Sequence, residues 1–222
     1  MTTGPYRQLW SRIRDAVREQ VQQAMGSVRP SHGIDHVTRV CALALEMAGE
    51  EGADEDVVEA AAWLHDIGRM AEEQSRGRIC HAREGARQAA EILEKLGAPR
   101  PFIDQVVHCV ASHRFRDEEH PETLEARVLF DADKLDSIGA VGLGRAFLFA
   151  GEVGARLHNP GVDPALHPDR GPEDTALREF TVKLRHVRHR LHTPAARRMA
   201  RGRHDFMVEF FQRLDDEVMG RR

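Results

Sequence analysis

The sequence predicts an all-α protein. Apolar residues recur at the spacing of amphipathic helices in most segments, and the alternation typical of strands does not persist anywhere. No internal repeat of about 20–50 residues is visible. With 222 residues, the chain can bury a sizeable core. We therefore expect a single domain over residues 1–222, with a motif-bearing core (28–150), a loop (151–174) and C-terminal helices (175–220).

The first two predicted helices cover residues 6–25 and 31–49. The first is amphipathic and indicates packing rather than chemistry. The second begins at Ser31, a residue type that caps helix N-termini, and places His36 on its apolar face. That face also contains Val40, Leu43 and Met47. His36 is therefore expected to be buried, with His32 one turn earlier beside it.

The third predicted helix, residues 54–66, ends in an adjacent histidine and aspartate, His65 and Asp66. Both continue rows of apolar side chains, so both are expected to point towards packed surface. The rows consist of Val57, Ala61 and Leu64, and of Val58 and Ala62. Burying a carboxylate without a partner is costly, so this position indicates a bound cation. A second pair, His204 and Asp205, lies in a basic stretch and is interpreted as a solvated helix face.

A polar connection follows at residues 69–77, and two further helices come after it. The connection is either a plain loop or a segment over the site that supplies carboxylates for proton transfer and arginines for phosphate contact. One helix opens at His81; the next spans 102–113 and finishes at His113. A polar turn is expected at residues 114–119.

The predicted helix at residues 122–136 contains three aspartates within six residues. Asp133 follows apolar residues by one turn and is expected on or beside the packed face, whereas Asp131 is expected to point away. A solvated acidic edge neutralised by Lys134 is the simpler interpretation. It is less attractive because the three inward candidates His36, His65 and Asp66 need a fourth ligand.

The last third of the chain is predicted as one buried helix, a long loop and two more helices. The helix covers residues 139–149 and includes Arg145, which is interpreted equally well as an ion-pair residue or a phosphate ligand. The loop covers 151–175, and its length favours a lid or an insertion. Residues 173–217 are expected to be helical, divided near Thr193 and Pro194. The histidines at 186, 189 and 192 alternate with arginines and are interpreted as a solvated basic face.

The composition excludes several classes of protein. The formal net charge of −4 gives no signature of nucleic-acid binding and favours small-molecule substrates. No apolar run is long enough to cross a membrane, and the N-terminus shows no secretory signal. The three cysteines are far apart, which argues against a disulfide framework and a zinc ribbon. We expect a cytoplasmic protein without a membrane or nucleic-acid partner.

Together these segments supply a set of candidate metal ligands from three helices: His36, His65, Asp66 and Asp133. Two histidines and two carboxylates leave open positions on a divalent Mn, Ni, Co, Fe, Mg or Zn ion, where water and a phosphate oxygen can bind. The set therefore favours hydrolysis of a phosphorylated substrate.

The ordered pattern H…HD…D resembles the HD superfamily of metal-dependent phosphohydrolases. The match includes the contexts DHVTRV at 35–40, WLHDIG at 63–68 and DADKLD at 131–136. Further residues at 138–145, 183–184 and 203–206 resemble the small bacterial HD proteins of the YpgQ/YedJ type. The resemblance implies an all-α HD-domain bundle with a C-terminal helical extension. It also implies hydrolysis of a phosphoester or phosphoanhydride, in this subgroup of nucleoside triphosphates to monophosphate and pyrophosphate.

Roles for individual residues follow from the ligand set and from the resemblance. His65, Asp66, His81 and Lys134 are expected to act in catalysis. The residues expected to bind substrate are His32, Arg39, Arg78, His113, Arg114, Lys134, Arg145 and Lys183. His81 and His113 either bind a second ion, as in the two-metal branch of the superfamily, or orient water near a single ion. We favour the single ion.

Other functions remain open on the sequence alone. A regulatory HD domain would bind a nucleotide without turnover, and a two-metal phosphodiesterase or a two-iron oxygenase would use His81 and His113 as ligands. A non-catalytic helical scaffold would leave inward carboxylates without partners. The substrate, the bond cleaved, the native metal and the oligomeric state are not indicated.

Overall fold

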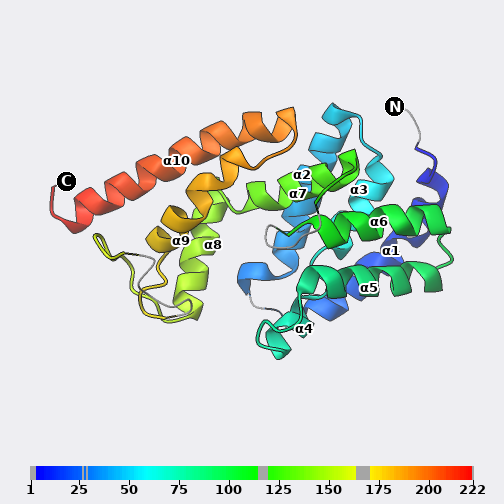
Figure 1. The fold of residues 1–222 in the computed structure, drawn as a ribbon, viewed down its shortest axis with the longest axis horizontal. Coiled ribbons are helices and arrows are strands. Elements are labelled where there is room, and N and C mark those ends of the chain that lie inside the picture. Colours follow the sequence, from blue (N-terminus) through cyan, green and yellow to red (C-terminus); the bar gives the residue numbers. More distant parts are fainter. Residues whose placement is uncertain (1–3, 27, 29, 115–119, 164–170, 222) are drawn as a thin grey trace. The chain divides into compact units, whose positions relative to one another are not determined.

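The computed structural model describes residues 4–26, 28, 30–114, 120–163 and 171–221 (Figure 1). These residues form helices and no strands, which confirms the all-α prediction. The helices are α1 (Arg7–Met25), α2 (Ile34–Glu51), α3 (Glu55–Leu64), α4 (Arg69–Gln74), α5 (His81–Lys95), α6 (Arg100–Ser112), α7 (Leu124–Asp136), α8 (Gly139–Glu152), α9 (Ala176–Val182) and α10 (Pro194–Val218). Short 3-10 helices cover Pro30–His32 and Leu184–His189. No described helix is both long and apolar enough to cross a membrane.

The chain divides into two compact units, Met1–Asp133 and Lys134–Arg222, with the boundary inside α7. The single domain expected over the whole chain stays a prediction. The first unit contains every candidate metal ligand, because Asp133 is its last residue.

Helix α3 is the centre of the first unit. It contacts α1, α2 and α6, and α5 lies alongside α6 (Figure 1). Its residues from Asp56 to Leu64 are all buried, as expected for a helix that is apolar on nearly every side. Asp54 caps its start, where one carboxylate oxygen accepts hydrogen bonds from the backbone N–H groups of Asp56 and Val57. The other end of this buried helix carries His65 and Asp66.

Two glycines let the end of α3 approach the start of α5. A Cβ at Gly68 would lie 2.3 Å from the carbonyl oxygen of His81 and 2.7 Å from the backbone nitrogen of Gly85. A Cβ at Gly85 would lie 3.3 Å from the carbonyl oxygen of His65. The close backbone contact places His81 beside the His65–Asp66 pair.

One local prediction in the first unit was wrong, and one of two open alternatives is excluded. Ser31 does not cap α2, because it lies in the 3-10 helix Pro30–His32 and α2 begins only after Gly33. Residues 69–77 are not a plain loop, because they include α4. An ion pair between Arg69 and Glu72, three residues apart, supports this short helix. Of the polar turn expected at 114–119, residues 115–119 lie outside the described residues.

The second unit is built on α10, which contacts α8 and the 3-10 helix Leu184–His189. The predicted break near Thr193 is confirmed: its Oγ1 accepts a hydrogen bond from the backbone N–H of Ala196, and Pro194 is the first helical residue. The prediction of a solvated His204 was wrong. It is 8% exposed and lies with Ala200, Met207 and Phe211 on the buried face of α10, whereas Asp205 is exposed.

A candidate metal centre

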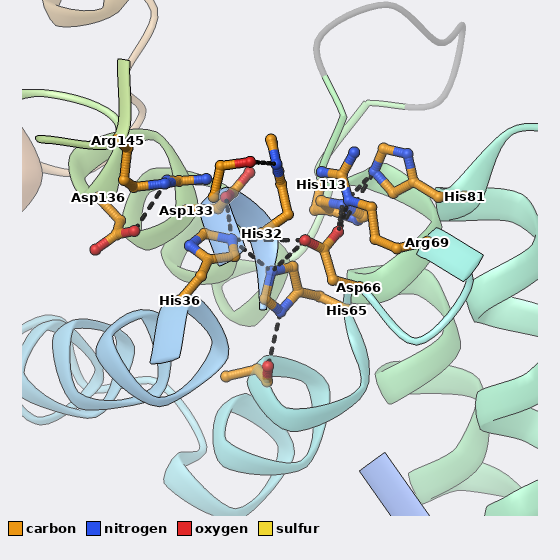
Figure 2. Close-up of polar contacts among 12 residues, drawn as sticks. His32, His36, His65, Asp66, Arg69, His81, His113, Asp133, Asp136 and Arg145 are labelled. Carbon is orange, nitrogen blue, oxygen red and sulfur yellow. Dashed lines mark hydrogen bonds and ion pairs between the residues drawn. The ribbon is translucent and has the colours of Figure 1, made fainter. Parts of the chain in front are cut away.

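The four candidate ligands lie together in the first unit (Figure 2). His36 comes from α2, His65 and Asp66 from the end of α3, and Asp133 from α7. Three of them are at most 1% exposed, and Asp133 is 8% exposed. His36 Nε2 is 3.3 Å from both His65 Nε2 and Asp133 Oδ1, and 3.6 Å from Asp66 Oδ2. The fold thus brings His36, His65 and Asp66 close enough together to hold one ion, and Asp133 lies beside His36.

The protonation states of this group call for a cation. His65 Nδ1 donates to the Ala62 carbonyl oxygen at 2.7 Å, so its Nε2 carries a lone pair that points at His36 Nε2. Burial lowers the pKa of His65 to about 4, so the imidazole is neutral at pH 7. Asp66 Oδ2 is buried and has no hydrogen-bond partner among the described residues. A divalent ion between these atoms would satisfy the lone pair and the carboxylate oxygen, so the residues fit a metal.

A second group shares Asp66. His81 Nε2 and His113 Nε2 are 3.2 Å apart, and they lie 3.5 Å and 3.6 Å from Asp66 Oδ1. His113 Nδ1 donates to the Val110 carbonyl oxygen at 2.6 Å, and His81 Nδ1 donates to Glu72 Oε2 at 2.9 Å. Both histidines thus turn Nε2 towards the same oxygen. Oδ2 of Asp66 faces His36 and His65, and Oδ1 faces His81 and His113, so two groups of potential metal ligands share this carboxylate.

Charged neighbours hold the carboxylates ionised. Burial alone would raise the pKa of Asp66, but Arg69 and the surrounding imidazoles hold it well below its ordinary value. Arg69 Nε donates to Asp66 Oδ1 at 2.9 Å. Burial would also raise the pKa of Glu72, yet the hydrogen bond from His81 and the charges of Arg69 and Arg114 lower it to about 2. Burial lowers the pKa of His81 to about 4, so a neutral imidazole donates to an ionised Glu72.

The sequence singles out neither Arg69 nor Glu72, which were expected only as members of the connection 69–77, with its arginines as candidates for phosphate contact and its carboxylates for proton transfer. A signal for both exists. Arg69 follows Asp66 by three residues, and Glu72 follows Arg69 by three. Once α4 is known to be helical, that spacing places the three charges on one side. The missed feature was the helix, which is six residues long and contains no buried residue.

The other residues expected at the site have diverse surroundings. His32 is half-buried, with its ring centroid 6.4 Å from that of His36. Arg114 Nη1 lies 3.1 Å from Glu72 Oε1, on the His81 side. Arg78 is exposed and donates to the Ser75 carbonyl oxygen. Arg39 and Lys134 are half-buried.

Three of the expected substrate-binding residues, Lys134, Arg145 and Lys183, belong to the second unit. Arg145 pairs with Asp136 there at 2.9 Å, which agrees with the ion-pair interpretation. Lys183 pairs with Glu179 at 2.7 Å.

Helix α7 is more buried than its sequence indicates. Asp131, expected to point away from the core, is 0% exposed, and Asp136 is 1% exposed. The apolar residues around them explain the difference, since Val128, Leu129, Phe130 and Ala132 are all buried and occupy successive sides of the helix. The simpler interpretation of a solvated acidic edge is therefore wrong.

Comparisons with known proteins identify the family. The family model described as the HD domain matches residues 33–138. Over 210 residues the chain is 31% identical to the uncharacterized protein YpgQ of Bacillus subtilis (strain 168), which covers 93% of this chain and 94% of YpgQ.

Solved structures agree with that match. B. subtilis YpgQ in complex with ADP matches with a TM-score of 0.71 and 29% identity, covering 94% of this chain and 96% of that one. A structure described as a predicted HD superfamily hydrolase, from an uncultured Thermotogales bacterium, gives a TM-score of 0.67 and 29% identity, covering 95% and 97%. The chain therefore belongs to the HD superfamily and, within it, to the YpgQ-type proteins.

Proposed function

We propose that this protein is a metal-dependent phosphohydrolase that cleaves nucleoside triphosphates to monophosphate and pyrophosphate. The observation that carries the proposal is the unpartnered, buried Asp66 Oδ2 beside the facing Nε2 atoms of His36 and His65. A divalent ion held there by these residues and Asp133 would lower the pKa of a bound water and neutralise charge on a phosphoryl oxygen.

The residues around the site would prepare it for that reaction. The carbonyl of Ala62 fixes the tautomer of His65, and Arg69 holds one oxygen of Asp66 while leaving the other available. Glu72 fixes His81 so that its Nε2 points inward. His81 and His113 would then orient water or the leaving group. Lys134 follows the ligand Asp133 in sequence and is our candidate for contact with a phosphate.

The nucleotide substrate is proposed from chemistry and from a relative. YpgQ has been solved with ADP, so a protein of this family binds a nucleotide. A polyphosphate would also suit a site that holds a metal ion beside arginines, because arginine side chains recognise phosphate in a bidentate manner.

A second arrangement uses two ions, with His81 and His113 as further ligands. The two groups of potential ligands share Asp66, and this geometry favours the two-ion form more than the sequence did. Metal analysis separates the alternatives, because one ion per chain supports orienting roles for His81 and His113, and two ions support ligand roles.

The test measures phosphate and pyrophosphate released from a panel of nucleotides by metal-stripped protein resupplied with Mn, Co, Ni or Mg. Asp66→Ala is the test variant. Asp205→Ala is the matched control, since it also follows a histidine but is exposed on α10. We expect metal-dependent release of pyrophosphate that falls by at least about a hundredfold in Asp66→Ala and is retained in Asp205→Ala. Bound metal without turnover of any nucleotide would contradict the proposal and support a nucleotide sensor.

A further inference from the structure

The second unit contains a pocket of its own, with a cavity volume of about 510 Å³. Its walls come from α9, the 3-10 helix Leu184–His189, α10 and residues 158–161. It shares no residue with the metal centre. A pocket of this volume is in the range that binds small molecules.

The floor of the pocket is apolar. Phe180 and Phe211 line it and stack on each other, with ring centroids 4.7 Å apart and an interplanar angle of 25°. They are 8% and 5% exposed, so they form part of the core and are fixed in place. Val208 also lines the pocket and is 46% exposed. The floor therefore offers apolar surface to a ligand.

The rim of the pocket is basic. Arg185, Arg188, His186 and His189 line it, all on the 3-10 helix. Arg185 is exposed, and no described residue forms an ion pair or hydrogen bond with it. Because its guanidinium has five donor N–H groups, it is available for an anion.

The carboxylate of the pocket already has basic partners. Among the described lining residues, Asp215 is the one carboxylate. Its oxygens lie 3.5 Å from His158 Nε2 and 2.5 Å from Arg221 Nη2. Arg185 and Arg188 therefore leave the pocket with an excess of positive charge.

Two buried histidines provide further polar atoms at the wall. The His158 side chain is 3% exposed, and its Nδ1 has no hydrogen-bond partner among the described residues. Burial and then the nearby charge of Arg188 lower the pKa of His204, with smaller contributions from His189 and Arg185. The positive electrostatic potential that disfavours protonation of His204 also favours binding of an anion in the pocket.

We propose that this pocket binds an organic phosphate, with its phosphate group at Arg185 and Arg188 and its apolar part on the floor at Val208, Phe180 and Phe211. Inorganic phosphate would leave most of the cavity unfilled, whereas a nucleoside monophosphate can use both the basic rim and the floor. The site is separate from the proposed hydrolase activity and does not depend on it.

The test titrates AMP into metal-stripped, full-length protein by calorimetry, with inorganic phosphate as the second probe. We expect saturable AMP binding that is tighter than phosphate binding. Arg185→Gln should weaken AMP binding by about tenfold or more, since it removes a charge-assisted hydrogen bond. Because Arg185 has no partner in the described residues, the change should leave the fold intact. Arg201→Gln, an exposed arginine of α10 outside the pocket lining, is the matched control and should not alter the affinity.

Two more variants locate the binding. Val208→Glu places an acid on an exposed position of the floor and should weaken AMP binding. Asp66→Ala should leave it unchanged, because Asp66 belongs to the metal centre. The proposal is overturned if AMP does not bind saturably, if phosphate binds as tightly as AMP, or if Arg185→Gln and Arg201→Gln have the same effect. Loss of AMP binding in Asp66→Ala would also overturn it.

Discussion

At the scale of single residues, two histidines of the candidate metal centre are held in the same way. His65 and His113 each follow the last residue of a helix, α3 and α6, and each donates Nδ1–H to the carbonyl oxygen three residues earlier. Carbonyl oxygens in the last turn of a helix have no intrahelical partner, so the imidazole satisfies one of them. The same bond sets the tautomer and directs Nε2 towards Asp66. A helix end thus prepares the ligand before any metal binds.

Burial of neutral histidines makes the stability of the metal-free protein depend on pH. The folded pKa values of His65 and His81 are lowered to about 4, below the unfolded value of about 6.5. The unfolded chain therefore binds more protons between these values, and stability is lost as the pH falls from about 6.5 to about 4. Each group contributes a slope of up to about 1.4 kcal/mol per pH unit.

Urea unfolding of metal-stripped protein at several pH values measures this slope. His81→Gln should reduce it, whereas His186→Gln, which removes an exposed histidine of the second unit, should not. A free energy of unfolding that stays constant from pH 7 to about pH 4 would contradict this, because it would show that the folded and unfolded chains bind the same number of protons and that burial does not lower the pKa of these histidines.

The sequence indicates the candidate metal ligands more clearly than it indicates their surroundings. His36, His65, Asp66 and Asp133 could be selected because their helical periodicity and motif context agree. Arg69 could not, since its role depends on α4, a six-residue helix without a buried residue. The sequence also did not indicate the burial of His204 and Asp131. Both have charged neighbours in sequence, and their burial depends on which helices pack against them.

At the scale of elements, the contact between the end of α3 and the start of α5 decides how the two histidine groups meet. Gly68 is required there because a Cβ would lie 2.3 Å from the backbone carbonyl oxygen of His81. A backbone atom cannot move aside as the end of a flexible side chain can. The sequence shows glycine at this position but does not show which chain segment approaches it. That information comes only from the packing of α5 on the turn after α3.

Gly68→Ala should therefore separate these elements. We expect it to lower the free energy of unfolding by about 1–3 kcal/mol, as overpacking does, and to weaken metal binding by moving His81 away from Asp66. Gly49→Ala is the matched control in α2. Its Cβ would meet only a Glu55 side-chain oxygen at 3.7 Å, so stability should stay equal or rise by about 0.5–1 kcal/mol. Chemical denaturation and metal titration of both variants check this. Equal stabilities for the two variants would mean that the turn adjusts without cost.

At the scale of the whole molecule, the two compact units divide the chemistry. The first unit holds all the candidate metal ligands, and the second holds the basic pocket. The sequence predicted the helical content of both but not this division, since the boundary falls inside the continuous helix α7. The apolar pattern of a continuous helix does not show which of its residues contact one unit and which contact the other.

Metal binding should stabilise the protein, because the candidate ligands come from α2, from α7 and from the residues that follow α3. A free Mn²⁺ concentration about 1,000-fold above Kd should add about 4 kcal/mol to the free energy of unfolding, because the ion binds the folded chain. Thermal unfolding with and without Mn²⁺ measures the gain. His36→Ala should abolish it, since His36 Nε2 is within 3.6 Å of His65, Asp66 and Asp133. Arg145→Ala removes an ion pair with Asp136 in the second unit and should retain it. A gain that survives in His36→Ala but disappears in His81→Ala would instead make Asp66, His81 and His113 the principal site, because the ion would then be held on the other oxygen of Asp66.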